Sequence, residues 1–169
     1  MFGIQFNVGA SREAIRRAIE QLEDARPLYQ EIAEYMTDAT RQRFISGTAP
    51  DGGKWPAKKQ STLDRYKRLG YGNLNRVLIG PGKRLSREIV SEATKTGAVI
   101  GSALIYSGVM QDGAARGAFG TNGRGRPIPW GNIPARTWLG ISRQDEERIV
   151  AIAEEYIAGA LDGGDRPAR

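Results

Sequence analysis

Histidine and cysteine, the side chains that most often serve as nucleophiles, general bases and soft metal ligands, are both missing from the 169-residue sequence. Their absence excludes Ser-His and Cys-His nucleophiles, imidazole or thiolate metal sites, and disulfide bonds. Chemistry could still be carried by carboxylates or by a glycine-rich phosphate loop. Neither forms a complete pattern, so we expect a protein without catalytic activity, cofactor or metal.

The segment Gly80-Pro81-Gly82-Lys83 has the glycines and the lysine of a phosphate-binding loop. The Walker pattern also requires a glycine where Val77 stands and a Ser or Thr where Arg84 stands, so the match fails.

Acidic residues do not complete a catalytic pattern. Segments 50–54 and 92–95 each contain one acid, whereas a metal-dependent nuclease needs several carboxylates around its ion. Four glutamates between residues 146 and 155 could supply a carboxylate pair for general acid/base catalysis, but they fall on the polar face of an amphipathic helix. A solvated or partner-binding face explains them better.

Basic charge is concentrated in the middle of the chain. The net charge is +6, but residues 41–87 hold twelve Lys or Arg against two Asp, a balance of +10. The flanking segments 11–39 and 142–162 are acidic, at −3 and −4. Such a basic surface can face nucleic acid, an acidic neighbouring subunit or water. No helix-turn-helix, zinc or aromatic-platform pattern accompanies it, so sequence-specific recognition is not indicated.

The N-terminal part of the chain predicts one strand followed by helices. Apolar residues alternate over residues 2–8, which is typical of a half-buried strand. From Ser11 onward apolar residues recur at helical spacing up to Gly47. Whether Pro27 breaks this helix or only kinks it is left open by the residue types. The first apolar face is expected to be buried and consists of Ala14, Ile15, Ala18, Ile19, Leu22 and Ala25.

The rest of the chain predicts short elements joined by long loops, closed by a helix that Ser142 caps and Gly163 ends. Its predicted apolar face consists of Ile149, Ile152, Ala153, Tyr156, Ile157 and Ala160. The other predicted elements are a basic helix at 62–69, a β-hairpin formed by 88–94 and 98–104, a helical turn at 106–111 and a flexible Gly/Arg-rich loop at 112–132.

These elements predict one α+β domain over residues 1–162, with a small antiparallel sheet packed by long N-terminal helices and a C-terminal helix. Residues 163–169 are expected to form a flexible tail. The N-terminus lacks the features of a signal peptide, and no apolar run is long enough to span a bilayer, so we expect a protein made in the cytoplasm and without membrane contact.

Two sets of residues are candidates for partner contacts. One set combines aromatic side chains with the segment 133–140 and should anchor the core or a subunit interface. It consists of Trp55, Trp130, Pro134, Arg136 and Trp138. The other set is basic and could face DNA or a partner. It consists of Lys83, Arg84, Arg116, Arg124 and Arg126.

Three segments in this order resemble the phage virion morphogenesis family, the tail-completion group of tailed phages and prophages. The first is Pro50-Asp51-Gly52-Gly53-Lys54-Trp55 with Ser61-Thr62-Leu63, which resembles the family's D-G-x-x-W loop. The second is Leu78-Ile79 through Ser86. The third and most specific is Ile133-Pro134-Ala135-Arg136-Thr137-Trp138-Leu139-Gly140, with Thr137-Trp138 where the family has Pro-Phe.

Between the second and third segments the resemblance continues with Ile100-Gly101 and with Tyr106, Gln111 and Gly113 of the family's Y-A-x-x-H-Q-F-G motif. Met110 stands in place of the histidine and Asp112 in place of the phenylalanine. The resemblance covers roughly residues 32–157.

The resemblance implies a non-enzymatic virion protein added where the tail joins the head. It implies a homo-oligomeric ring, expected to be a hexamer, in contact with head-connector and tail-tube or terminator proteins and possibly, without sequence specificity, with packaged DNA. The competing interpretation, from the basic middle alone, is a free protein that binds nucleic acid without sequence specificity.

Overall fold

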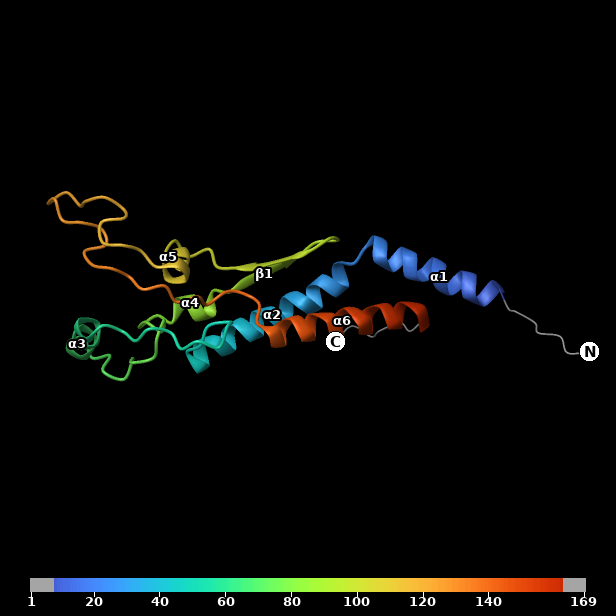
Figure 1. Ribbon diagram of the computed structural model, residues 1–169, viewed down its shortest axis with the longest axis horizontal. Helices are drawn as coiled ribbons and strands as arrows, with labels where there is room; N and C mark the ends of the chain where they lie inside the picture. Colours follow the sequence, from blue (N-terminus) through green and yellow to red (C-terminus); the bar gives the residue numbers. More distant parts are fainter. Residues whose placement is uncertain (1–7, 163–169) are drawn as a thin grey trace, which may run out of the picture.

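The computed structural model describes residues 8–162 as six helices and a two-stranded antiparallel sheet, which confirms the α+β fold class (Figure 1). The strand predicted for residues 2–8 lies outside the described residues except for Val8, which already begins a helix, and so does the tail at 163–169. The elements are α1 (Val8–Glu23), α2 (Arg26–Ser46), α3 (Gln60–Arg68), α4 (Arg84–Arg87), β1 (Val90–Ala93), β2 (Ala98–Gly101), α5 (Ser107–Asp112) and α6 (Arg143–Asp162).

The three long helices pack together: α6 runs antiparallel to α1 and α2 and packs against both (Figure 1). The chain breaks between α1 and α2 and does not merely kink, because Ala25 leaves the helical conformation and Pro27 sits in the first turn of α2. Proline is tolerated there because the first amides of a helix have no intrahelical partner. Gly47 ends α2 with a φ of 69°, as predicted.

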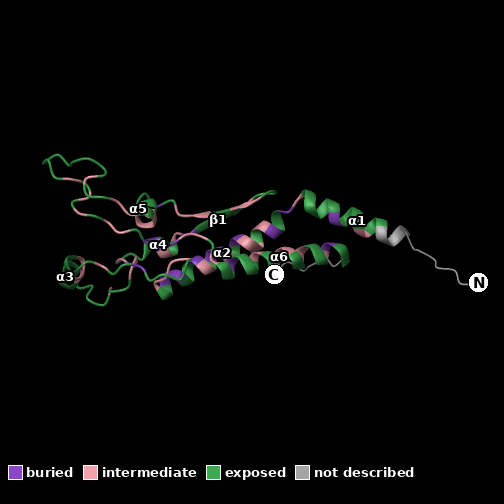
Figure 2. Cartoon of the chain, viewed as in Figure 1, coloured by how far each residue is buried: buried purple, intermediate pink, exposed green. Residues whose placement is uncertain are grey.

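Helix α1 packs through its alanines and not through its larger apolar residues. Ala18 in α1 and Ala25 just after it are buried, whereas Ile15, Ile19 and Leu22 are 52–56% exposed. Figure 2 shows α1 mostly in the colour of exposed residues. The prediction that the whole apolar face is buried is therefore wrong for these three residues. It is also wrong for Ile157 in α6, which is 43% exposed. Small side chains let helices approach closely, and the large ones then remain beside the contact.

The sheet is the predicted hairpin, shorter than expected, and it lies on α2. Val90 pairs with Gly101 and Ala93 with Ala98. Thr94 donates its backbone N–H to the carbonyl of Gly97 at 2.8 Å, which closes the turn. The basic helix α3 and the turn α5 are also present, whereas the sequence did not predict α4.

Two apolar clusters stabilise this elongated arrangement at different places along α2. The larger one gathers residues from the end of α2, from α4 and from several loops; it consists of Phe44, Trp55, Ile79, Leu85, Ile89, Leu104 and Trp138. The smaller one joins the start of α2 to α6 and consists of Ala25, Leu28 and Ile152. No helix in the described range is both long and apolar enough to cross a bilayer.

The Gly/Arg-rich segment forms a projecting arm, defined here as residues 114–133 (Figure 1). Backbone bridges pair Ala114 with Ile133 at its base and Thr121 with Pro127 near its tip. Phe119 donates its N–H to the carbonyl of Ile128 at 2.7 Å between them. The sequence predicts a flexible Gly/Arg-rich loop at 112–132, and the structure adds that the backbone of this loop is paired at its base and near its tip.

Candidate functional site

The segment 133–140, called the anchor segment below, is fixed by two buried tryptophans. Trp138 is 3% and Trp55 5% exposed, and both rings contact Phe44 at centroid distances of 6.0 and 5.4 Å. The indole N–H of Trp55 donates to the carbonyl of Thr137 at 2.9 Å, and that of Trp138 to the carbonyl of Ser107 at 3.1 Å. Both buried indoles therefore have hydrogen-bond partners, as a core position requires.

Gln111 holds the anchor segment against α5. Its side-chain oxygen accepts the N–H groups of Trp138 and Leu139 at 2.9 and 3.0 Å, and its amide nitrogen donates to the carbonyl of Leu139 at 2.8 Å. Arg136 extends this contact by donating its backbone N–H to Met110. The half-buried side-chain amide of Gln111 thus makes hydrogen bonds with the backbone of this segment that a neighbouring β-strand would otherwise make.

A buried ion pair fixes the start of α6. The guanidinium of Arg43 donates to the carboxylate of Asp145 and, at 2.7 Å, to the carbonyl of Gly140. Tyr35 donates to the same carboxylate at 3.1 Å, and Ser142 through its N–H at 2.7 Å. Burial alone would raise the pKa of Asp145, but the hydrogen bonds from Ser142, the charge of Arg43 and the Tyr35 hydroxyl together lower it.

Two further cations, the buried Arg136 and the half-buried Lys58, form no ion pair with a carboxylate of the described residues. Arg136, 8% exposed, donates to the carbonyls of Pro56 and Ala57 at 2.8 and 3.1 Å, and burial lowers its pKa. Lys58 donates to the carbonyls of Leu74 and Ile79 at 2.5 and 2.7 Å. Burial and, to a smaller extent, the charge of Arg136 lower the pKa of Lys58. These two side chains tie three loops together while leaving positive charge beside a cavity.

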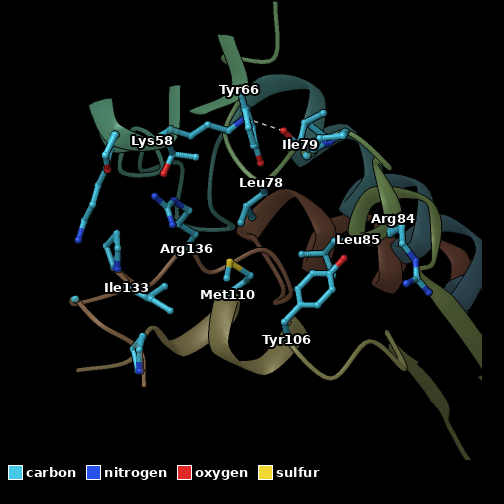
Figure 3. A pocket seen from close by; sticks show the side chains of 18 of the residues that line it. Lys58, Tyr66, Leu78, Ile79, Arg84, Leu85, Tyr106, Met110, Ile133 and Arg136 are labelled. Atoms are coloured by element: carbon cyan, nitrogen blue, oxygen red, sulfur yellow. Dashed lines mark hydrogen bonds between the residues drawn. The ribbon is translucent and has the colours of Figure 1, made fainter. Parts of the chain in front are cut away.

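That cavity is a cleft of about 520 Å³ between α3, α4, α5 and the base of the arm (Figure 3). Its floor is apolar and includes Leu78, Ile79, Leu85 and Met110. Its cationic lining residues are Lys58, Lys59, Lys83, Arg84 and Arg136, and no Asp or Glu of the described chain lines it. In Figure 3, Lys58 and Arg136 lie on one side of the floor and Arg84 on the other. The cleft is therefore apolar inside and positive around its edge.

The cations at the edge of the cleft differ in whether they already have a hydrogen-bond or ion-pair partner within the subunit. Arg84 already pairs with Glu88 at 2.7 Å, and Lys59 donates to the carbonyl of Asn132 at 2.7 Å. Lys83 is exposed, and its ammonium group has no hydrogen bond or ion pair to the described residues. Its φ of 52° is unusual for a residue other than glycine, and it turns the chain into α4.

The arm carries the other basic candidates. The side-chain oxygen of Asn122 accepts the backbone N–H groups of Arg124 and Arg126 at 2.9 and 3.0 Å, which shapes the tip. Arg116 is fixed through its backbone N–H, which donates to Asn132 at 2.8 Å. The three arginine side chains are exposed. Trp130, also on the arm, is 78% exposed and is therefore not a core anchor.

The structure thus divides the predicted site residues. It brings Trp55, Arg136 and Trp138 together in the core, with Pro134 half-buried at the base of the arm. It places Lys83 and Arg84 at the cleft, and it keeps Arg116, Arg124 and Arg126 on the arm. Within residues 8–162, no three acidic side chains gather in a way that could hold a metal ion.

Sequence reasoning missed three contributors. The sequence assigns no contact to Arg43 or Asp145, because a pairing over 102 residues has no local signal. Gln111 was noticed only as part of a motif, without a role. Its place beside the anchor segment explains why the two motifs belong together.

Comparison with protein families gives one match. The model of the phage virion morphogenesis family matches residues 7–158, nearly the whole chain. No curated protein and no solved structure matches the chain. The matched range includes the helices, the cleft, the arm and the anchor segment.

Proposed function

Because the chain belongs to the phage virion morphogenesis family, we propose that it is a structural protein of the head–tail connector. In this proposal it completes the tail of the phage particle as one subunit of a ring, expected to be a hexamer, around the DNA channel. It acts through surfaces and not through catalysis. Its neighbours are copies of itself, a head-connector protein and a tail-tube or terminator protein.

The observation that carries the proposal is the arm. It projects from the body on a base fixed to the core through the anchor segment, and it presents three exposed arginines and the exposed ring of Trp130. A projecting hairpin buries little of itself in its own subunit, so its apolar and basic side chains are available to a neighbour or to the packaged DNA. A lone protein gains no stability from such an element.

The second candidate function is non-specific nucleic-acid binding by the free protein. The +10 balance of residues 41–87 favours it, as does the cluster of exposed cations on α3 formed by Arg65, Lys67 and Arg68. Phosphate contacts of this kind give strong salt dependence. A salt titration of duplex DNA binding separates the two: steep salt dependence with tight binding by a monomer favours this candidate, and absence of binding outside the particle favours the connector.

The arm provides a direct test of the connector. We expect Arg124→Ala combined with Arg126→Ala to leave the free energy of unfolding within about 0.5 kcal/mol of wild type, because both side chains are exposed. The same pair should reduce the yield of infectious particles in a complementation assay. Arg12→Ala with Arg17→Ala removes two exposed arginines from α1 and is the matched control.

Cryo-electron microscopy of the particle neck, with the copy number of this chain in purified particles, tests the location. Density for several copies around the channel agrees with the proposal. A protein that is absent from finished particles contradicts it, whatever the arm variants do.

A further inference from the structure

The cleft described above needs an occupant with particular properties. Its floor offers an apolar surface, and its edge offers positive charge that carboxylates of the described chain pair with only at Arg84, through Glu88. A volume of about 520 Å³ lies within the range of about 300–1,000 Å³ that binding pockets occupy. A complementary ligand is apolar in the middle and acidic at its sides.

Helix α6 presents such a surface. At about 100° per residue, five of its exposed side chains fall within an arc of about 80°. The apolar ones are Val150, Ile157 and Leu161, which are 55%, 43% and 47% exposed. Glu146 and Glu154 lie at the two edges of this arc, and neither forms an ion pair with the described residues. We call these five residues the outer face of α6.

The side of the same helix that packs on its own subunit lies next to this arc. Ile152 and Ala160 are buried there, and the hydroxyl of Tyr156 donates to the carbonyl of Gln21 in α1 at 3.2 Å. The outer face lies outside these contacts and stays exposed in its own subunit. Three apolar side chains at spacings of seven and four residues are the pattern by which a helix enters a groove.

The outer face lies along α6, which begins near the middle of an elongated molecule and runs away from the helices around the cleft (Figure 1). Helices α3, α4 and α5, which surround the cleft, are at one end, and the C-terminal half of α6 is at the other. The chain cannot fill its own cleft with this helix while α6 stays on α1 and α2. A contact between the two surfaces must therefore join different molecules, head to tail.

We propose that the outer face of α6 of one subunit docks into the cationic cleft of the next. Val150, Ile157 and Leu161 contact the apolar floor, and Glu146 and Glu154 approach the positive edge, where the ammonium group of Lys83 has no partner among residues 8–162. A head-to-tail contact of this type closes into a ring or extends into a filament according to its rotation. The inference deepens the proposed function, because it assigns the contact from which the ring of that proposal is built.

Charge exchange between the two surfaces tests the contact. Lys83→Glu and Glu154→Lys should each weaken self-association about tenfold or more in sedimentation equilibrium at low salt, because each places like charges opposite one another. Mixing the two variants in equal amounts should restore association. When the two variants alternate in an assembly, each cleft meets an outer face of opposite charge. The double variant should associate without a partner for the same reason.

Two controls match the changes in net charge. Arg12→Glu alters the total charge as Lys83→Glu does, and Glu92→Lys on β1 alters it as Glu154→Lys does; neither residue belongs to the cleft or to the outer face. We expect both controls to associate like wild type. Circular dichroism and thermal melts of every variant show whether the fold is retained.

Several results would overturn the proposal. One is a wild-type protein that stays monomeric at every concentration and salt tested. Another is association that Glu154→Lys abolishes while Lys83→Glu leaves it intact, because α6 would then meet another α6 or the exposed apolar residues of α1. A third is a monomer that binds a fluorescent DNA oligonucleotide through Lys83, since the cleft would then be a binding site for nucleic acid and not for α6.

Failure of this contact and failure of the proposed function give different results. If subunits associate through another surface, the charge variants behave like wild type while particles still contain the protein at the neck. If the function is wrong, particles lack the protein while the charge exchange still restores association in solution.

Discussion

Trp55 and Trp138 act as the two largest anchors of the core, and each combines an apolar ring with a satisfied N–H group. They come from loops and not from helices or strands, so their packing fixes chain segments that have little regular structure of their own. Trp138 also sits in the most specific motif of the sequence. Its role in stability can be separated from any role in assembly by comparison with Trp130.

We predict that Trp138→Ala lowers the free energy of unfolding by about 3–5 kcal/mol, because truncation of a buried aromatic ring leaves a cavity and an unpaired carbonyl. Trp130→Ala should change it by less than about 0.5 kcal/mol, since the ring is 78% exposed. Urea denaturation of both variants measures the difference. Equal losses would show that Trp130 packs against the core.

The Arg43–Asp145 pair links the end of α2 to the start of α6, and it makes stability dependent on pH. Because the folded pKa of Asp145 is lower than its ordinary value of 3.8, its contribution is fully present above about pH 4 and is lost as the pH falls through the folded pKa. Asp145→Asn removes this contribution. The variant should be about 3–5 kcal/mol less stable near neutral pH, because Arg43 is left buried without a counter-charge.

Urea denaturation between pH 6 and pH 2 checks the sign of this effect. The gap in unfolding free energy between wild type and Asp145→Asn should narrow toward the acid end. A gap that stays constant over this range would mean that Asp145 keeps the same protonation state in the folded and unfolded chains.

At the scale of elements, the base of the arm depends on one glycine. Gly113 ends α5 with a φ of 75°, and its N–H donates to the carbonyl of Val109 at 2.9 Å. A Cβ at this position would lie 2.6 Å from the backbone nitrogen of Ala135 and 2.6 Å from the carbonyl oxygen of Ile133. The arm can leave the core here only because this position has no side chain.

Gly113→Ala should therefore reduce the free energy of unfolding by about 2 kcal/mol or more, through both strain and displacement of the anchor segment. Gly123→Ala near the tip is the matched control, because a Cβ there meets no atom within 4 Å. Thermal unfolding measures both. Unchanged stability in Gly113→Ala would show that the arm can shift its base without affecting the core.

The sequence predicts the helices other than α4, the hairpin and the cap at Ser142 well, because each has a local signal in spacing or in turn chemistry. It does not predict which apolar residues of a helix are covered. The spacing of Ile15, Ile19 and Leu22 is correct for a buried face, but the neighbour of α1 is another helix that fits against Ala18. The pairing within the arm was missed because its residues have no alternating apolar pattern.

At the scale of the whole molecule, neither of the two apolar clusters of the described chain contains a residue of α1, which packs on α6 at one end. Helix α1 contributes only small side chains to the packing, so we predict that its amides exchange with solvent faster than those of the C-terminal half of α2, which carries Phe44. Hydrogen exchange of the isolated protein followed by mass spectrometry tests this. Equal protection in both helices would mean that α1 and α2 open together.

The candidate site was only partly predictable from the sequence, because it depends on how distant segments are arranged in the whole molecule. Sequence identifies Lys83, the tryptophans and the arginines of the arm as unusual in type or context. It cannot show that residues from α3, α4, α5 and the anchor segment surround one cleft, because these segments meet only through the fold. For Trp130 the exposure of the ring excludes the core alternative, and the residue stays an interface candidate.

The three tryptophans also give a way to test the proposed contact between subunits. Two indoles are buried and one, Trp130, stands in solvent on the arm. In a free subunit an aqueous quencher such as acrylamide therefore reaches one emitting ring and is kept from the other two. When a neighbour covers the arm, that accessible fraction of the fluorescence becomes protected, so subunit contact can be followed in real time without an attached dye.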